Sequence, residues 1–200
     1  LVSSSAASDV YKRQGLNVTT GAEHTLIGGS AGDALTTGDR NVAVGTNALG
    51  GDTQGSRNVA VGYAALVTQN FTTGTNAYNV AVGYDAGGAV TTGQSNTFIG
   101  GLAGDAITTG SHNVAVGTEA LTTNTQGSRN VAVGRQALNS MNTTTATEAF
   151  NTAVGDQAGI SVTTGTKNTL IGGLAGDEII GGDNNAVSYT HLRAHETATY

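Results

Sequence analysis

The five residues NVAVG at positions 41–45 recur along this chain and decide its fold. Their general form is Asn, then Val or Thr, an apolar residue, Val or Ile, and Gly, and it occurs nine times. A short, nearly gap-free repeat is typical of a solenoid, in which each repeat forms one coil. We count positions within a coil from the first residue of this core, and the nine coils begin at His24 (in place of Asn), Asn41, Asn58, Asn79, Asn96, Asn113, Asn130, Asn151 and Asn168.

The spacing of the cores adds a longer period. The intervals between successive core positions are 17, 17, 21 and 17, and this order then repeats, so that His24, Asn96 and Asn168 begin equivalent coils of a 72-residue unit. We therefore predict an all-β fold, a parallel β-solenoid or β-roll, over residues 15–186, with a truncated tenth coil from Asn185. The ends, residues 1–14 and 187–200, do not belong to the repeat. They resemble translated sequencing-adapter read-through, and we expect them to be non-native or disordered.

Small residues hold fixed places in every coil. The eighth position is Ala in all nine coils, so we expect it to press against a neighbouring strand or chain. Gly-rich and Asn-rich stretches divide each coil, which predicts two short strands separated by turns. The fifth position is always Gly, as a corner with positive φ or close backbone approach would demand, for example at Gly45, Gly62, Gly117 and Gly134.

The Asn at the first position predicts a ladder along the stack. Asn tolerates left-handed geometry and bonds its own turn, so we expect stacked Asn side chains to satisfy backbone groups at successive turns. A role in ligand binding is the less favoured interpretation. The ladder includes Asn41, Asn58, Asn113 and Asn130.

The first strand of each coil is apolar on both faces. Positions two and four are Val, Thr or Ile and share one face, while position three points the other way. Position three is Ala in six coils but Leu26, Phe98 and Leu170 once in each 72-residue unit. A strand that is apolar on both faces is usually buried on both, and one coil layer covers only one of them. We expect position three to face a second copy of the chain, so that Phe98 lies in an oligomer interface.

Composition excludes several classes of protein. The chain has 31 Gly, no Pro, no Cys and no Trp, and only 11% of its residues are charged, so it has too few large side chains for a thick core. The absence of Cys excludes disulfides and thiolate metal sites. A net charge of −6 with eight Lys and Arg argues against a nucleic-acid partner. No apolar run approaches the roughly 18 residues of a membrane span, so we expect no membrane insertion of this segment.

The units NVAVGTNAL (41–49), NVAVGYAAL (58–66) and NTAVGDQAG (151–159) resemble the head repeats of YadA-type trimeric autotransporter adhesins. They are equally similar to repeats of phage and bacterial tail-fibre proteins upstream of an endosialidase-type chaperone domain. The resemblance implies a left-handed β-roll, a homotrimer, and an extracellular place on a bacterial surface or a phage tail. We therefore expect a non-enzymatic adhesin or receptor-binding fibre that attaches to a cell surface or glycan. The alternative is a purely structural tail-fibre shaft.

Two longer coils carry insertions, at residues 68–78 and 140–150. A coil of fixed perimeter cannot absorb extra residues, so the insertions are expected to bulge outward as loops. Aromatic side chains on exposed loops suit stacking on sugar rings. Tyr78 and Phe150 precede a core Asn and have the alternative role of covering the core, whereas Phe71 and Met141 are expected to be exposed. The candidate ligand-contact residues are Phe71, Tyr78, Met141 and Phe150.

Catalytic and metal-binding patterns are weak. We find no Ser-His-Asp set, paired-carboxylate site or phosphate loop, and so expect no enzyme and no cofactor. His191 and His195 have the spacing of metal ligands on a helix, but they fall in the non-repeat end. The segment at 172–186 resembles a calcium-binding nonapeptide without its nine-residue register. We expect no metal site.

Overall fold

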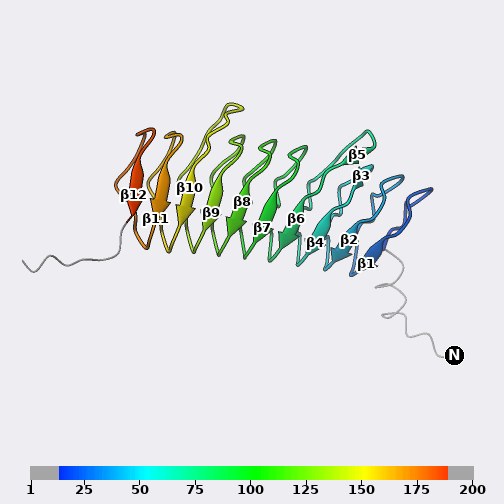
Figure 1. The fold of residues 1–200 in the computed structure, drawn as a ribbon. Coiled ribbons are helices and arrows are strands. Elements are labelled where there is room, and N and C mark those ends of the chain that lie inside the picture. Colours follow the sequence, from blue (N-terminus) through cyan, green and yellow to red (C-terminus); the bar gives the residue numbers. More distant parts are fainter. Residues whose placement is uncertain (1–13, 189–200) are drawn as a thin grey trace, which may run out of the picture.

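The computed structural model describes residues 14–188 as a stack of coils and confirms the predicted parallel β-solenoid (Figure 1). No helix occurs in this range. One short strand from each coil joins a ten-stranded parallel sheet that runs the length of the molecule. Its strands are β1 (Thr25–Ile27), β2 (Val42–Val44), β4 (Val59–Val61), β6 (Val80–Val82), β7 (Thr97–Ile99), β8 (Val114–Val116), β9 (Val131–Val133), β10 (Thr152–Val154), β11 (Thr169–Ile171) and β12 (Ala186–Ser188).

The repeated cores pair in strict register. Val42 lies opposite Val59, and Val59 opposite Val80, although the coil between the last two carries the first insertion. The extra residues are therefore accommodated outside the sheet. β12 pairs with β11 as far as Ser188, which lies beyond the predicted end of the repeat.

The two faces of the sheet are reversed relative to the prediction. Position three points into the roll: Ala43 and Phe98 are fully buried, whereas positions two and four lie on the outer face and are half-buried or exposed. The expectation that Phe98 faces a second copy is therefore wrong. Each coil buries at least one larger side chain, such as Leu49 or Val90, which leaves room mainly for the methyl groups of positions three and eight, and all nine Ala of position eight are buried, Ala31 through Ala175.

The predicted second strand does not form. Positions seven and nine have positive φ, as at Asn47 (59°) and Leu49 (52°), and such values are incompatible with an extended strand. Stacked turns replace it, and hydrogen bonds such as Leu49 N–H to Ala65 O (2.9 Å) link each turn to the next. A second sheet has only β3 (Gly55–Ser56) and β5 (Thr75–Asn76).

The fifth-position corner requires glycine, as predicted. Gly117 has a φ of 131°, and a Cβ atom there would lie 2.6 Å from the carbonyl carbon of Gly134 in the next coil. No side chain fits between backbones at this separation. The same conformation recurs at Gly45 and Gly62.

The Asn ladder is present and buried. Asn41 Oδ1 accepts hydrogen bonds from Asn58 N (2.9 Å) and Asn58 Nδ2 (3.1 Å), and Asn41 Nδ2 donates to Gly55 O (2.8 Å). The same links join Asn113 to Asn130. The Asn residues of the ladder do not themselves take the left-handed conformation, contrary to expectation, because the residue before each Asn takes it instead.

Candidate functional site

One exposed residue per coil forms a line along the corner that leads into the main strands. Each precedes the first position of a coil, has a φ of 52–64°, and is exposed. The left-handed backbone makes the corner and directs successive side chains outward, one coil apart. We name this set the corner column: Glu23, Arg40, Arg57, Tyr78, Ser95, His112, Arg129, Phe150, Lys167 and Asn184.

The corner column collects positive charge on an acidic chain. Five Lys and Arg side chains lie between positions 14 and 188, and four of them are in the column: Arg40, Arg57, Arg129 and Lys167. The column holds one carboxylate, Glu23, while the whole chain has a net charge of −6. The cations are therefore concentrated on one line rather than scattered.

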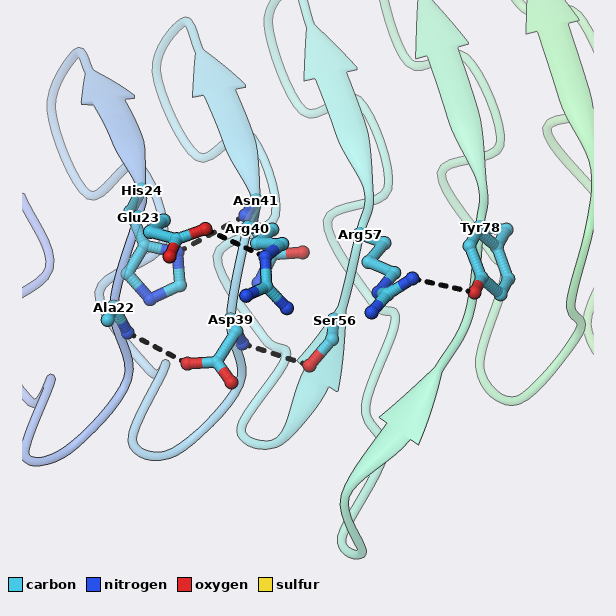
Figure 2. A network of polar contacts seen from close by, with 9 residues as sticks. All are labelled: Ala22, Glu23, His24, Asp39, Arg40, Asn41, Ser56, Arg57 and Tyr78. Atoms are coloured by element: carbon cyan, nitrogen blue, oxygen red, sulfur yellow. Dashed lines mark hydrogen bonds and ion pairs between the residues drawn. The ribbon is translucent and has the colours of Figure 1, made fainter.

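Neighbouring column residues contact each other directly. Figure 2 shows Arg40 Nε paired with Glu23 Oε2 at 2.7 Å. Arg57 Nη1 donates to the Tyr78 hydroxyl at 3.0 Å, and its Cζ lies 5.5 Å from the centroid of the Tyr78 ring. The guanidinium of Arg57 thus makes both a hydrogen bond and a cation–π contact with the next coil.

The same cation–aromatic pair recurs in the next 72-residue unit. Arg129 Cζ lies 5.6 Å from the centroid of the Phe150 ring. Phe150 has no hydroxyl, and Arg129 Nε instead pairs with Glu148 Oε1 at 2.8 Å. The two pairs are four coils apart, about 19 Å by the spacing of adjacent strands.

A second polar line fixes the backbone beneath the column. Asp39 N–H donates to Ser56 Oγ and Ala22 N–H donates to Asp39 Oδ1, both at 2.9 Å (Figure 2). At the far end Thr166 donates to Asp183 from both N and Oγ1, and the backbone hydrogen bond, followed by the side-chain bond, lowers the pKa of Asp183. These contacts hold neighbouring corners together at both ends of the column.

Both insertions emerge at one edge of the solenoid and run directly into the corner column (Figure 1). β5 within the first insertion pairs with β3, and Ser128 forms a single bridge to Glu148 in the second. Their exposed tips are residues 72–74 and 144–146, four of which are Thr. The predicted outward bulges are therefore confirmed and lie beside Tyr78 and Phe150.

The exposure of the candidate ligand-contact residues differs from the prediction. Phe71 and Met141, expected to be exposed, are 5% and 0% exposed. Tyr78 and Phe150, for which covering the core was the alternative, are 49% and 46% exposed. Only Tyr78 and Phe150 of these four therefore stand on the surface, and the structure places each beside a column arginine.

The backbone of Phe71 is hydrogen-bonded to a buried polar cluster that the sequence analysis missed. Asp52 accepts hydrogen bonds from Gly55 N and Phe71 N, both at 3.0 Å, and from Gln69 Nε2 at 2.7 Å. Gln69 Oε1 in turn accepts from Asn79 Nδ2 at 2.7 Å. Burial raises the pKa of Asp52, against the effect of these donors.

The second insertion has an uncharged cluster at the equivalent positions. In the next 72-residue unit Asn124 and Met141 take the positions of Asp52 and Gln69, and Thr143 takes that of Phe71. Thr143 Oγ1 donates to Asn124 Oδ1 at 3.0 Å, and the Met141 sulfur accepts from the ladder. An alignment of the two units would have paired Met141 with buried Gln69 rather than with Phe71.

The opposite corner, at position six, carries a pair of stacked aromatic rings that the sequence analysis did not single out. Tyr63 and Tyr84 are exposed and stacked, with ring centroids 5.4 Å apart and an interplanar angle of 9°. Further along the same line Arg135 pairs with Asp156 at 2.9 Å. Aromatic residues at position six of consecutive coils are the sequence signal.

The described residues offer little for metal or acid–base chemistry. Within residues 14–188 no three His, Asp or Glu side chains are grouped as metal ligands would be, while His191 and His195 lie outside this range. Burial, followed by repulsion from Asp85, raises the pKa of Asp105 to about 6, and the buried Oδ1 of Asp105 has no hydrogen-bond partner among the described residues. In the described part of the chain no helix is long and apolar enough to span a membrane.

Comparisons with models of protein families, with curated proteins and with solved structures gave no match. The surface of the solenoid itself therefore has to indicate the function. Two features of that surface stand out, the apolar outer face of the main sheet and the corner column with its adjoining insertions.

Proposed function

We propose that this chain is a non-enzymatic segment of a homotrimeric extracellular fibre, an adhesin or receptor-binding fibre that attaches to a cell surface or glycan. Its place would be a bacterial surface or a phage tail. Fold alone does not imply function, so the proposal depends on what the solenoid exposes.

The observation that carries the proposal is the outer face of the main sheet. Positions two and four present only Val, Thr and Ile from β1 to β11, without one charged side chain. An apolar surface that runs the length of a protein supports association, because soluble monomers rarely leave such a surface in water. Ile27, Ile99 and Ile171 are the most exposed Ile residues of this face.

A closed trimer suits this geometry. Three parallel rods that each turn one flat face inward bury all three faces around a threefold axis, whereas an isolated roll has a core made largely of Ala. Burial of the outer face would leave the insertions and the corner column available along the fibre. Display of three copies then multiplies weak contacts with a surface.

Adhesion of coated beads to cells or immobilised glycans tests the attachment function. We expect beads coated with the full chain to adhere, and beads coated with Val116→Asp, which places a charge on the outer face, to adhere at least tenfold less. If wild-type beads bind no more than albumin-coated beads across bacterial and animal cells and a glycan array, the attachment function is wrong.

A structural shaft is the second candidate, and the burial of Phe71 and Met141 favours it. Both insertions contribute to the core, as expected of residues that only widen a coil. Deletion of residues 72–75 and 144–147, which removes both exposed tips, separates the two functions. A shaft predicts unchanged adhesion of the whole fibre after deletion, whereas an attachment segment predicts a loss.

A further inference from the structure

We propose that the corner column binds a linear polysaccharide that carries carboxylate or sulfate groups at intervals. This inference rests on the proposed attachment function and names the class of glycan. The residues that would make the contacts are the two cation–aromatic pairs, Arg57 with Tyr78 and Arg129 with Phe150, extended by Arg40 and Lys167.

The spacing of the cations fits a sparsely charged polymer. Arg40 and Arg57 are one coil apart, Arg57 and Arg129 four, and Arg129 and Lys167 two. The row therefore spans about 34 Å at one strand spacing per coil. Duplex DNA carries about one charge per 1.7 Å and would meet far fewer cations than phosphates along this line. The net charge of −6 further opposes a densely charged polyanion.

Each pair offers two complementary contacts to a sugar acid. The planar guanidinium presents parallel N–H donors that match a carboxylate or sulfate group. The neighbouring ring is about half exposed, at 49% for Tyr78 and 46% for Phe150, and gives the C–H face of a sugar ring an apolar surface. Cation–π contact holds ring and guanidinium together before the ligand arrives, which lowers the ordering cost.

The cations are available to a ligand. Arg57 and Lys167 form no ion pair within residues 14–188. Arg129 pairs with Glu148 and Arg40 with Glu23, but both pairs are solvent-exposed, and exposed ion pairs contribute little stability. A sugar carboxylate or sulfate can therefore take the place of the Glu side chain.

Binding of the full chain to four polymers tests the inference: chondroitin sulfate for sulfate at wide intervals, alginate for carboxylate, dextran as the neutral polymer, and oligo-dT as the nucleic acid. The key variant is Arg57→Ser/Arg129→Ser, because Ser95 already occupies the same column with a φ of 57°. The matched control is Arg135→Ser, which removes an exposed arginine at the opposite corner. Circular dichroism checks that each variant keeps the solenoid.

We expect chondroitin sulfate, alginate or both to bind the wild-type chain. The polymer that binds should bind Arg57→Ser/Arg129→Ser at least tenfold more weakly, and Arg135→Ser within twofold of wild type. Added salt should weaken binding, and Tyr78→Ser/Phe150→Ser should weaken it at every salt concentration, since the ring contact is apolar. Dextran and oligo-dT should bind at least tenfold more weakly than the acidic polysaccharide.

The inference is overturned if neither acidic polymer binds, if Arg135→Ser weakens binding as much as the column variant, or if oligo-dT binds as tightly with the same dependence on Arg57 and Arg129. Bead adhesion separates this failure from failure of the proposed function. Adhesion that persists in Arg57→Ser/Arg129→Ser and resists competition by chondroitin sulfate and alginate supports the attachment function but contradicts binding of the polysaccharide. Column-dependent polysaccharide binding without any bead adhesion supports the site and contradicts the attachment function.

Discussion

Phe98 occupies the space left by the missing side chain of Gly87, where a Cβ atom would lie 2.7 Å from Phe98 Cδ2. Gly104 in the coil of Phe98 faces the other side of the ring. Leu170 fits between Gly159 and Gly176 in the same way. The long period thus has a packing cause, because one large residue at position three requires glycine at position nine of its own coil and of the preceding one.

This complementarity predicts the cost of Gly87→Ala. The added methyl group overlaps the Phe98 ring at a residue whose φ of 59° also disfavours a side chain, and we expect a loss of about 1–3 kcal/mol in the free energy of unfolding. Gly101→Ala is the control, since a Cβ atom there meets nothing within 4 Å. Chemical denaturation measures both, and Phe98→Leu should restore part of the loss in Gly87→Ala. Equal stability of the two Ala variants would refute the packing explanation.

Phe98→Asp is expected to unfold the solenoid instead of dividing an assembly. The side chain is fully buried, and a carboxylate without a partner there costs several kcal/mol. Far-UV circular dichroism at room temperature should show loss of β structure. A variant that keeps wild-type β structure and changes only its oligomeric state would contradict the internal position of Phe98 and support its place in an interface.

The Asn ladder predicts a large effect from one exchange. Asn113→Ala removes the acceptor of Asn130 N and Nδ2 and the donor to Gly127 O. Buried groups left without partners cost about 1–3 kcal/mol each, so we expect a loss of about 3 kcal/mol. The exposed Asn142→Ala should change the stability by less than about 0.5 kcal/mol. Similar midpoints in urea for these two variants would contradict the ladder's role.

The cluster under the first insertion predicts coupling between Asp52 and Gln69. Asp52→Asn places an amide N–H group against Gln69 Nε2, so that two donors face each other. Gln69→Met removes the Nε2 donor from the Asp52 carboxylate. The double variant has the Asn and Met found at Asn124 and Met141, so each change should offset the other. A double-mutant cycle should give a coupling energy of about 1–3 kcal/mol, and additive effects would contradict the arrangement.

Asp105 predicts how stability depends on pH. Burial and then Asp85 raise its pKa to about 6 from the ordinary 3.8, so the folded chain holds a proton that the unfolded chain releases. This stabilisation is complete below about pH 3.8 and is lost as the pH rises through about 6. Melting temperatures measured from pH 4 to pH 7 should fall less in Asp105→Asn than in wild type. Identical pH profiles would exclude Asp105 as the cause.

The sequence allowed the fold and register to be predicted, because the period and the invariant Gly leave few other arrangements. It did not identify the inner face, since Ala at position three and Val at positions two and four are all apolar. Volume decides between them, as Ala43 and Phe98 show: small residues fit at every coil, and a large one only beside glycine.

The candidate site was predicted less well than the fold. Apolar character alone does not separate buried Phe71 from exposed Tyr78, and the backbone N–H of Phe71 is held by Asp52, a partner in the preceding coil. The corner column was missed because its residues vary in type and share only their backbone conformation. The equivalent places of Arg57 and Arg129 in successive 72-residue units were the signal that could have revealed it.

Sedimentation equilibrium of the full chain at micromolar concentration tests the homotrimeric fibre most directly. We predict a mass three times that of the 19.8 kDa chain, independent of salt concentration because the proposed interface is apolar. Val116→Asp should lower this mass while the circular dichroism of the solenoid is retained. A wild-type chain that is folded and sediments as a monomer throughout the micromolar range would contradict the account.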